Sequence, residues 1–197
     1  MKYNDVTILT ANTRDIIINK NELAARLKVS RNFENDLVTL CTDRLMDVIT
    51  YKCAYIKTSI DLSQINQCDF GFMDVVSRNL YQNLLGCHQA FVMAVTTGIG
   101  VDRLLAKLNV TSQAEHFITD AVSSAAVESF CDYASNILQT EYNCRPRFSP
   151  GYGDVSLKTQ KPLLDRLNAS ELLGITLNHS YLMTPVKSIT AIMGVQS

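Results

Sequence analysis

The feature that most constrains the fold is a long helical pattern that begins at Ser112 and runs to about Gln139. The segment Ser112-Gln-Ala-Glu115 is a capping box, which starts a helix by satisfying its first backbone N–H groups. One stripe of the helix then carries Ile118, Val122, Ala125, Ser129, Tyr133 and Ile137. The small residues Ser123–Ala126 would let another backbone approach closely. This pattern predicts the longest helix of the chain.

The remaining segments mix helical and strand patterns without a regular strand–helix–strand repeat. Helices are predicted at Asn21–Val29, Glu34–Thr50, Ser77–Leu85 and Val101–Leu108, with two short helices within Leu157–Gly174. Strands are predicted at Tyr51–Ile60 and Cys87–Gly98, and the tail Gly174–Val195 predicts two or three short ones. We therefore expect one α+β domain over 1–197, with a twisted, mainly antiparallel sheet and flanking helices.

Composition excludes several classes of partner and site. The net charge of −1 gives no overall attraction for nucleic acid or for acidic membranes. The six cysteines contain no C-x-x-C pair and fit scattered apolar residues in a reducing compartment. No signal peptide and no long apolar run occurs. A cytoplasmic protein is expected.

Sequence motifs for the common catalytic sites are missing. There is no phosphate-binding P-loop and no G-x-S-x-G nucleophile elbow. Gly98 and Gly100 follow a strand and precede a helix, but the third glycine of a dinucleotide site is missing, which favours a tight turn. His88, His116 and His179 show no metal-ligand spacing. No catalytic residue and no metal ligand is therefore predicted.

The run CRPRFSPGYGD, Cys144 to Asp154, is unusually rich in charged and conformationally special residues. Arg147 offers a permanent planar cation suited to a carboxylate. Pro150 fixes its backbone, Gly151 permits close approach, and Tyr152 adds a flat face with a polar tip. These residues could bind a zwitterionic, partly aromatic molecule. The alternative, a Pro-Gly turn with an incidental surface arginine, stays open.

Several motifs in order resemble one known domain. RFSPGYGD is similar to the R-x-x-x-G-Y-P motif of the activation domain of cobalamin-dependent methionine synthase. AVTTGIGVDRLL, AAVESFCDY and NHSYLMTPVKSITAI are similar to other segments of that domain, in the same order. The resemblance covers about Gly98 to Val195, whereas 1–97 is divergent. It implies an S-adenosylmethionine (AdoMet) site and a role in the reductive methylation of cobalamin.

The resemblance also implies site residues. Arg147 matches the arginine that contacts the AdoMet carboxylate, and Glu128 matches the acidic residue that faces its amino group. Ser149 matches a position whose backbone reaches the ligand, and Gly151 and Tyr152 match the Gly-Tyr that lies against ligand and corrin. From the helical pattern alone, Glu128 lies at the edge of the apolar stripe, so a solvated position for it also stays open.

Two departures from the family pattern accompany these matches. Gly153 stands where the family has proline, which predicts a looser loop. The first hundred residues contain no counterpart of the N-terminal aspartate that also contacts AdoMet in the family.

The resemblance thus implies a stand-alone reactivation module. It would act on a separate cobalamin-binding methyltransferase, such as a methionine synthase without its own activation domain, with a flavodoxin- or ferredoxin-type reductant. One alternative is a non-catalytic accessory or adaptor that has lost AdoMet binding. Another is an unrelated small-molecule-binding domain that shares only the loop.

Overall fold

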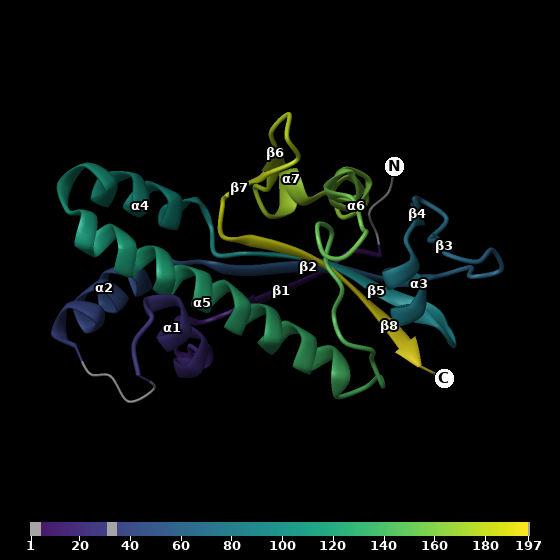
Figure 1. Cartoon of the computed structure of the whole chain (residues 1–197), viewed down its shortest axis with the longest axis horizontal. Coiled ribbons are helices and arrows are strands. Elements are labelled where there is room, and N and C mark those ends of the chain that lie inside the picture. The colour runs from purple at the N-terminus through teal and green to yellow at the C-terminus, as the bar shows by residue number, and fades with distance from the viewer. Residues whose placement is uncertain (1–4, 31–34, 197) are drawn as a thin grey trace.

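The computed structural model describes residues 5–30 and 35–196 and is built around one four-stranded antiparallel sheet (Figure 1). Its strand order is β1-β2-β5-β8. The bounds are Thr7–Ala11 for β1, Tyr51–Ser59 for β2, Cys87–Thr96 for β5 and Ser188–Gln196 for β8. The predicted α+β class with a mainly antiparallel sheet is confirmed.

Both faces of this sheet are covered, because alternate residues of its strands enter two different cores. Phe91, Met93 and Val95 of β5 belong to one apolar cluster, whereas Val92 and Ala94 belong to the other. Side chains of a strand point alternately to opposite faces, so a strand covered on both sides is apolar along nearly its whole length. This explains the continuous apolar run that identified β5 in the sequence.

The first face carries the long helix α5, Gln113–Gln139, together with α1 (Lys20–Leu27), α2 (Asp36–Met46) and α4 (Ile99–Thr111) (Figure 1). The predicted long helix is confirmed. Only half of its capping box forms: the Ser112 hydroxyl accepts from the Glu115 backbone, whereas the Glu115 side chain pairs with Arg44. The Ser112 N–H instead donates to the Leu108 carbonyl at 2.9 Å.

The second face carries α3 (Arg78–Leu84), α6 (Gln160–Arg166) and α7 (Ala169–Leu172). The smaller elements are a 3₁₀ turn at Thr13–Asp15, a second one at Leu157–Thr159, the β3–β4 hairpin (Gln67–Asp69 and Asp74–Val76) and the β6–β7 hairpin (Thr176–Leu177 and Met183–Thr184). None of the described helices has the length and apolar character needed to cross a membrane.

Several predicted boundaries were wrong. The helix predicted at 34–50 ends at Met46, and Glu34 lies outside the described residues. The helix predicted at Val101–Leu108 is longer, and the last strand of the tail spans nine residues rather than a few. Strands β1, β3 and β4 had not been predicted.

The predicted tight turn at Gly98 and Gly100 is confirmed, and packing explains both glycines. Gly98 has φ +82°, and a Cβ there would lie 2.1 Å from the Thr50 hydroxyl oxygen. A Cβ on Gly100 would lie 2.4 Å from the Val48 carbonyl oxygen. The glycines therefore allow the start of α4 to pack against the turn that precedes β2.

Candidate functional site

The segment that contains Arg147 forms an irregular edge strand beside β8 rather than a free loop. Arg145 N–H donates to the Gly194 carbonyl at 2.8 Å, and Phe148 exchanges two backbone hydrogen bonds with Ile192, at 2.9 and 2.8 Å. Because side chains alternate along such a segment, Phe148 packs with the α3–α6 core while Arg147 reaches α5 on the other face. This pairing fixes the direction of the Arg147 side chain.

After Ser149 the chain turns back sharply. Gly151 has φ +90°, and its N–H donates to the Val155 carbonyl at 2.8 Å, while Tyr152 N–H donates to the Ser149 carbonyl at 3.1 Å. Gly151 thus adopts a left-handed backbone conformation that favours glycine, whereas its predicted close approach to a ligand stays a prediction. Because the chain leaves the edge of β8 at this point, no strand among the described residues pairs with the first residues of β8 on that side.

The prediction that Gly153 loosens this loop was wrong, because the turn is fastened to α3. Asp154 accepts hydrogen bonds from the Ser77 hydroxyl, from Arg78 N–H at 2.8 Å and from Asn79 N–H at 3.3 Å. These contacts, with that of Ser77 the largest, hold the pKa of Asp154 below its usual range. Gly153 itself has φ +55°, a conformation that proline cannot adopt.

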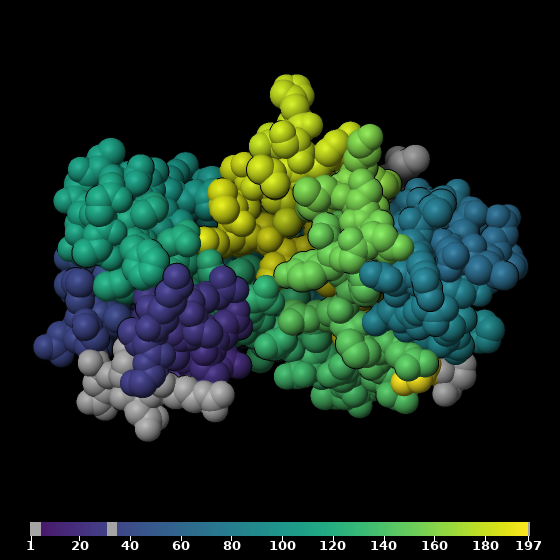
Figure 2. Space-filling model, in the orientation of Figure 1, coloured from purple at the N-terminus to yellow at the C-terminus, as the bar shows by residue number. Residues whose placement is uncertain are grey.

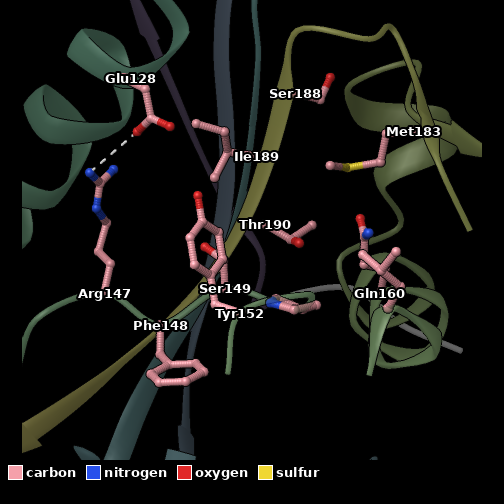
Figure 3. Close-up of a pocket in the computed structure, with 12 residues that line it drawn as sticks. Glu128, Arg147, Phe148, Ser149, Tyr152, Gln160, Met183, Ser188, Ile189 and Thr190 are labelled. Atoms are coloured by element: carbon pink, nitrogen blue, oxygen red, sulfur yellow. Dashed lines mark ion pairs between the residues drawn. The ribbon is translucent and has the colours of Figure 1, made fainter. Parts of the chain in front are cut away.

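A cavity of about 510 Å³ opens where the edge of β8 is left unpaired (Figure 3). Its walls come from α5, the 147–157 turn, α6 and the tail. The lining residues are Glu128, Arg147, Phe148, Ser149, Pro150, Tyr152, Leu157, Gln160, Met183, Ser188, Ile189 and Thr190. Figure 2 shows the green 147–165 region beside the yellow tail on one face of the molecule. A hydrogen bond from the Gln160 side chain to the Tyr181 carbonyl joins these two segments.

Four of the five predicted site residues line this cavity: Glu128, Arg147, Ser149 and Tyr152. Gly151, the fifth, shapes the turn between Ser149 and Tyr152. The Glu128 side chain is 32% exposed and so lies partly buried at the cavity. The Tyr152 residue is 67% exposed and stands at the rim. The structure therefore brings together residues that the sequence separates by up to 24 positions.

One end of the cavity is charged. Arg147 Nη2 lies 3.7 Å from Glu128 Oε2 and 2.6 Å from Asp132 Oδ1 (Figure 3 shows the Glu128 pair). Arg147 Nη1 is buried and has no hydrogen-bond partner among the described residues. The guanidinium thus retains unused donor capacity next to the cavity.

The electrostatics of Glu128 are set mainly by burial. Burial raises the pKa of this carboxyl above its usual range, although Arg147 acts in the opposite direction. Glu22 and Arg26 of α1 also act on the carboxyl, with opposite signs. A cation placed beside Glu128 would favour its ionised form.

The opposite end of the cavity is uncharged and was missed by sequence reasoning. It contains Gln160 of α6, Met183 of β7 and the hydroxyl residues Ser188 and Thr190 of β8. The tail motif marked the segment that supplies the last three, but no sequence signal marked Gln160. Asp132 was also missed, although it lies one helical turn beyond Glu128 and on the same face.

The floor of the cavity is the unpaired edge of β8. In an antiparallel strand, residues two apart present their backbone groups to the same side. Ile192 faces outward to Phe148, so the N–H and carbonyl of Thr190 face outward as well, beyond the end of that pairing. The floor thus offers a backbone donor and acceptor to a ligand.

The groups that line the cavity are suited to binding a small molecule. Cys131, the thiol nearest Arg147 on α5, is fully buried, and burial raises its pKa to about 11. Among the described residues, no group of three or more His, Cys, Asp or Glu side chains is arranged to hold a metal ion. The cavity can clamp a molecule that carries both charges at one end and a neutral polar group at the other.

Comparisons with known proteins identify the fold. No protein-family model matches the chain, and no curated protein matches it. Among solved structures it is similar to one described as "Crystal Structure of the MetH Reactivation Domain bound to AdoHcy". The TM-score is 0.68 at 13% sequence identity, over 96% of this chain and 78% of that one. The chain therefore has the fold of the MetH reactivation domain.

Proposed function

We propose that this chain binds AdoMet or AdoHcy in the cavity beside β8 and serves as a stand-alone reactivation module for a cobalamin-dependent methyltransferase. The observation that carries the proposal is the pairing of Arg147 with Glu128 at one end of that cavity, in a fold shared with a domain bound to AdoHcy. The proposal is a binding function, supported by residues on three separate elements.

The charged end suits the amino-acid part of such a ligand. The ligand carboxylate can accept from the unused guanidinium donors of Arg147, and its ammonium can donate to Glu128. Glu128 makes no short hydrogen bond to Arg147, so its oxygens are available. A ligand ammonium would also reduce the electrostatic cost of burying the Glu128 carboxylate, because a nearby positive charge favours the ionised form of this group.

The neutral end suits a nucleoside. Leu157 and Met183 offer apolar surface for a flat base, and the hydroxyl residues and the β8 edge offer hydrogen bonds to its polar atoms. Tyr152 at the exposed rim could lie across the ligand and contact a partner at the same time. A molecule with an amino-acid head and a nucleoside tail fits this order of groups.

The methyl acceptor in this proposal is reduced cobalamin on a separate methyltransferase, with a flavodoxin- or ferredoxin-type protein as reductant. The cofactors supply the methyl-transfer chemistry, while this chain supplies binding and orientation. Its partner would approach the rim that carries the exposed Tyr152. The proposal places the protein in the cytoplasm, in keeping with its six free cysteines.

Calorimetry with AdoMet and with AdoHcy tests the binding function. We expect Arg147→Ala to lower the affinity for each ligand by about tenfold to a hundredfold, which is the contribution of one or two charge-assisted hydrogen bonds. Arg145→Ala is the matched control, because Arg145 lies on the same segment but bonds the Leu85 carbonyl and does not line the cavity. The absence of binding heat for the wild type at millimolar ligand would refute the proposal.

One observation favours a second candidate, an accessory protein that no longer binds AdoMet. Asp132 already occupies Arg147 at 2.6 Å, as the carboxylate of a ligand would. Such a protein would still associate with a corrinoid methyltransferase. Association with that partner, combined with no binding of AdoMet or AdoHcy, would select the accessory role.

A further inference from the structure

We propose that Gln160 reads the 6-amino group of the ligand's purine, through its side-chain carbonyl oxygen, and so selects adenine over a 6-oxo base. This inference rests on the proposed function and concerns the neutral end of the same cavity. It assigns a specificity-determining role to a residue that neither the sequence nor the charged end of the site had indicated.

Gln160 is a buried polar side chain with one unused hydrogen-bonding atom. Only 4% of the residue is exposed, although it lines the cavity from the first turn of α6. Its Nε2 donates to the Tyr181 carbonyl at 3.2 Å, and its Oε1 has no partner among the described residues. A buried acceptor without a partner is unfavourable, which makes a ligand donor at this position favourable.

The orientation of this amide is fixed by its surroundings. Reversing it would place two carbonyl oxygens, those of Gln160 and Tyr181, against each other. Tyr181 cannot easily turn its carbonyl away, because the N–H of the same planar peptide unit, that of Leu182, is held by the Asn178 side chain. The Asn178 side chain in turn accepts from Ser180 N–H and Leu182 N–H, at 2.8 and 3.0 Å. Oε1 is therefore the atom left for a ligand.

Gln160 lies across the cavity from the charged pair. Figure 3 shows Arg147 and Glu128 on one side, Gln160 and Met183 on the other, and Ile189 and Thr190 between them. A ligand whose amino-acid head contacts Arg147 would extend over β8 toward Gln160. Figure 3 also shows the Gln160 amide directed between Thr190 and Met183, into the space that such a ligand would enter.

The chemistry around Gln160 favours the edge of a flat base. The thioether of Met183 and the side chain of Leu157 can pack on an aromatic ring, and methionine adapts its conformation readily. One of the two Nε2 hydrogens is used by the Tyr181 carbonyl, and the side-chain atom of Gln160 without any partner among the described residues is the acceptor Oε1. Adenine presents an N–H donor at position 6, whereas hypoxanthine presents a carbonyl oxygen, which Oε1 would repel.

The experiment compares AdoHcy with S-inosylhomocysteine, in which the 6-amino group is replaced by a carbonyl. We expect the wild type to prefer AdoHcy by about tenfold or more, the value of one hydrogen bond and one repulsive contact. Gln160→Met should reduce this preference to about threefold or less, mainly by weakening AdoHcy. The control Gln82→Met alters an exposed glutamine of α3 and should keep the wild-type preference.

The outcomes separate this inference from the function on which it rests. Equal binding of the two ligands by the wild type, with both weakened by Arg147→Ala, would overturn the role of Gln160 and leave the proposed function intact. Binding of neither ligand would overturn both. The wild-type comparison needs no variant, so equal binding of the two ligands would overturn the inference even if Gln160→Met fails to fold. A preference unchanged in a folded Gln160→Met protein would also overturn the inference.

Discussion

The substitution Gly153→Pro restores the family residue in the R-x-x-x-G-Y-P motif, and the structure predicts that it harms this chain. Gly153 has φ +55°, whereas proline is fixed near −65°. The turn from Gly151 to Val155 would have to open, and with it the contacts of Asp154 with the start of α3. We expect a loss of at least about 3 kcal/mol in the free energy of unfolding.

The milder substitution Gly153→Ala should produce a smaller loss of stability by two effects, backbone strain and crowding. Holding an L-residue in the left-handed region costs about 1–2 kcal/mol. The new Cβ would also lie 2.3 Å from Asn79 Nδ2, so the Asn79 side chain must move, at a further cost of about 0.5–1.5 kcal/mol. The total of about 1.5–3.5 kcal/mol corresponds to a fall of about 7 °C in Tm for a domain of this size.

Gly174→Ala is the matched control, because Gly174 has φ +70° and an added Cβ would meet nothing within 4 Å. It isolates the backbone cost, about 1–2 kcal/mol or about 4 °C in Tm. Urea denaturation gives the free energies, and calorimetry with AdoHcy reports on the cavity, where Gly153→Pro should weaken binding by about tenfold or more through displacement of Tyr152. A Gly153→Pro protein as stable as the wild type would refute the reasoning.

Three further predictions test the charges and the core. If Glu128 accepts from the ligand ammonium, the affinity of the wild type for AdoHcy should decline as pH falls through the raised pKa of this carboxyl. The Glu128→Gln variant should bind AdoHcy weakly, and its affinity should not change between pH values of about 4 and 7. A wild-type affinity that is also independent of pH would contradict this. Phe130→Ala should lower the free energy of unfolding by about 3–5 kcal/mol, measured in urea, because Phe130 is fully buried; a loss below about 1 kcal/mol would show that the core collapses around the gap. Lys187→Met should lower the free energy of unfolding by about 1–2 kcal/mol, because the buried ammonium binds Asp120 and Ser124 at 2.7 and 2.8 Å. An unchanged Tm would show that the energy of these contacts is offset by the cost of desolvating the ammonium.

The elements that could be predicted from sequence are those with local signals. Ser77 caps α3 by accepting from the Leu80 N–H at 3.0 Å, and Gly86 follows the helix with φ +81°. β5 could be recognised because its residues are apolar on both faces. β1 could not, because Thr7–Ala11 is a mostly exposed edge strand with no strong apolar pattern.

The length of β8 was missed for a reason that involves distant residues. Gly194 lies inside β8, although glycine generally weakens a strand interior. A Cβ at this position would lie 2.7 Å from Cys87 Sγ and 2.8 Å from a methyl carbon of Leu84. The glycine is needed because α3 and β5 pack directly over it, and no local pattern could show this.

The site was predictable in its charged residues and not in its supports. Arg147 belongs to the motif RFSPGYGD and Glu128 to the motif AAVESFCDY, and the structure places both residues at the cavity. Asp154 belongs to the same run, but its contact is with α3, more than seventy positions earlier in the chain. Gln160 becomes notable only when burial and the Tyr181 carbonyl are both known. Long-range contacts determine these roles.

The two walls of the cavity are held at a fixed separation by one face of α5. Asp120, Ser124, Glu128 and Asp132 recur every four residues and so lie along one side of the helix. Lys187, just before β8, binds the first two, while Arg147 is paired with the last two. Lys187 directly precedes β8, and the segment that carries Arg147 is hydrogen-bonded to the outer edge of that strand, so the position of β8 relative to α5 sets the width of the site. A ligand that displaces Asp132 from Arg147 would remove one of these ties and leave that of Lys187. The charged end of the cavity can therefore adapt to a ligand while its floor stays in place.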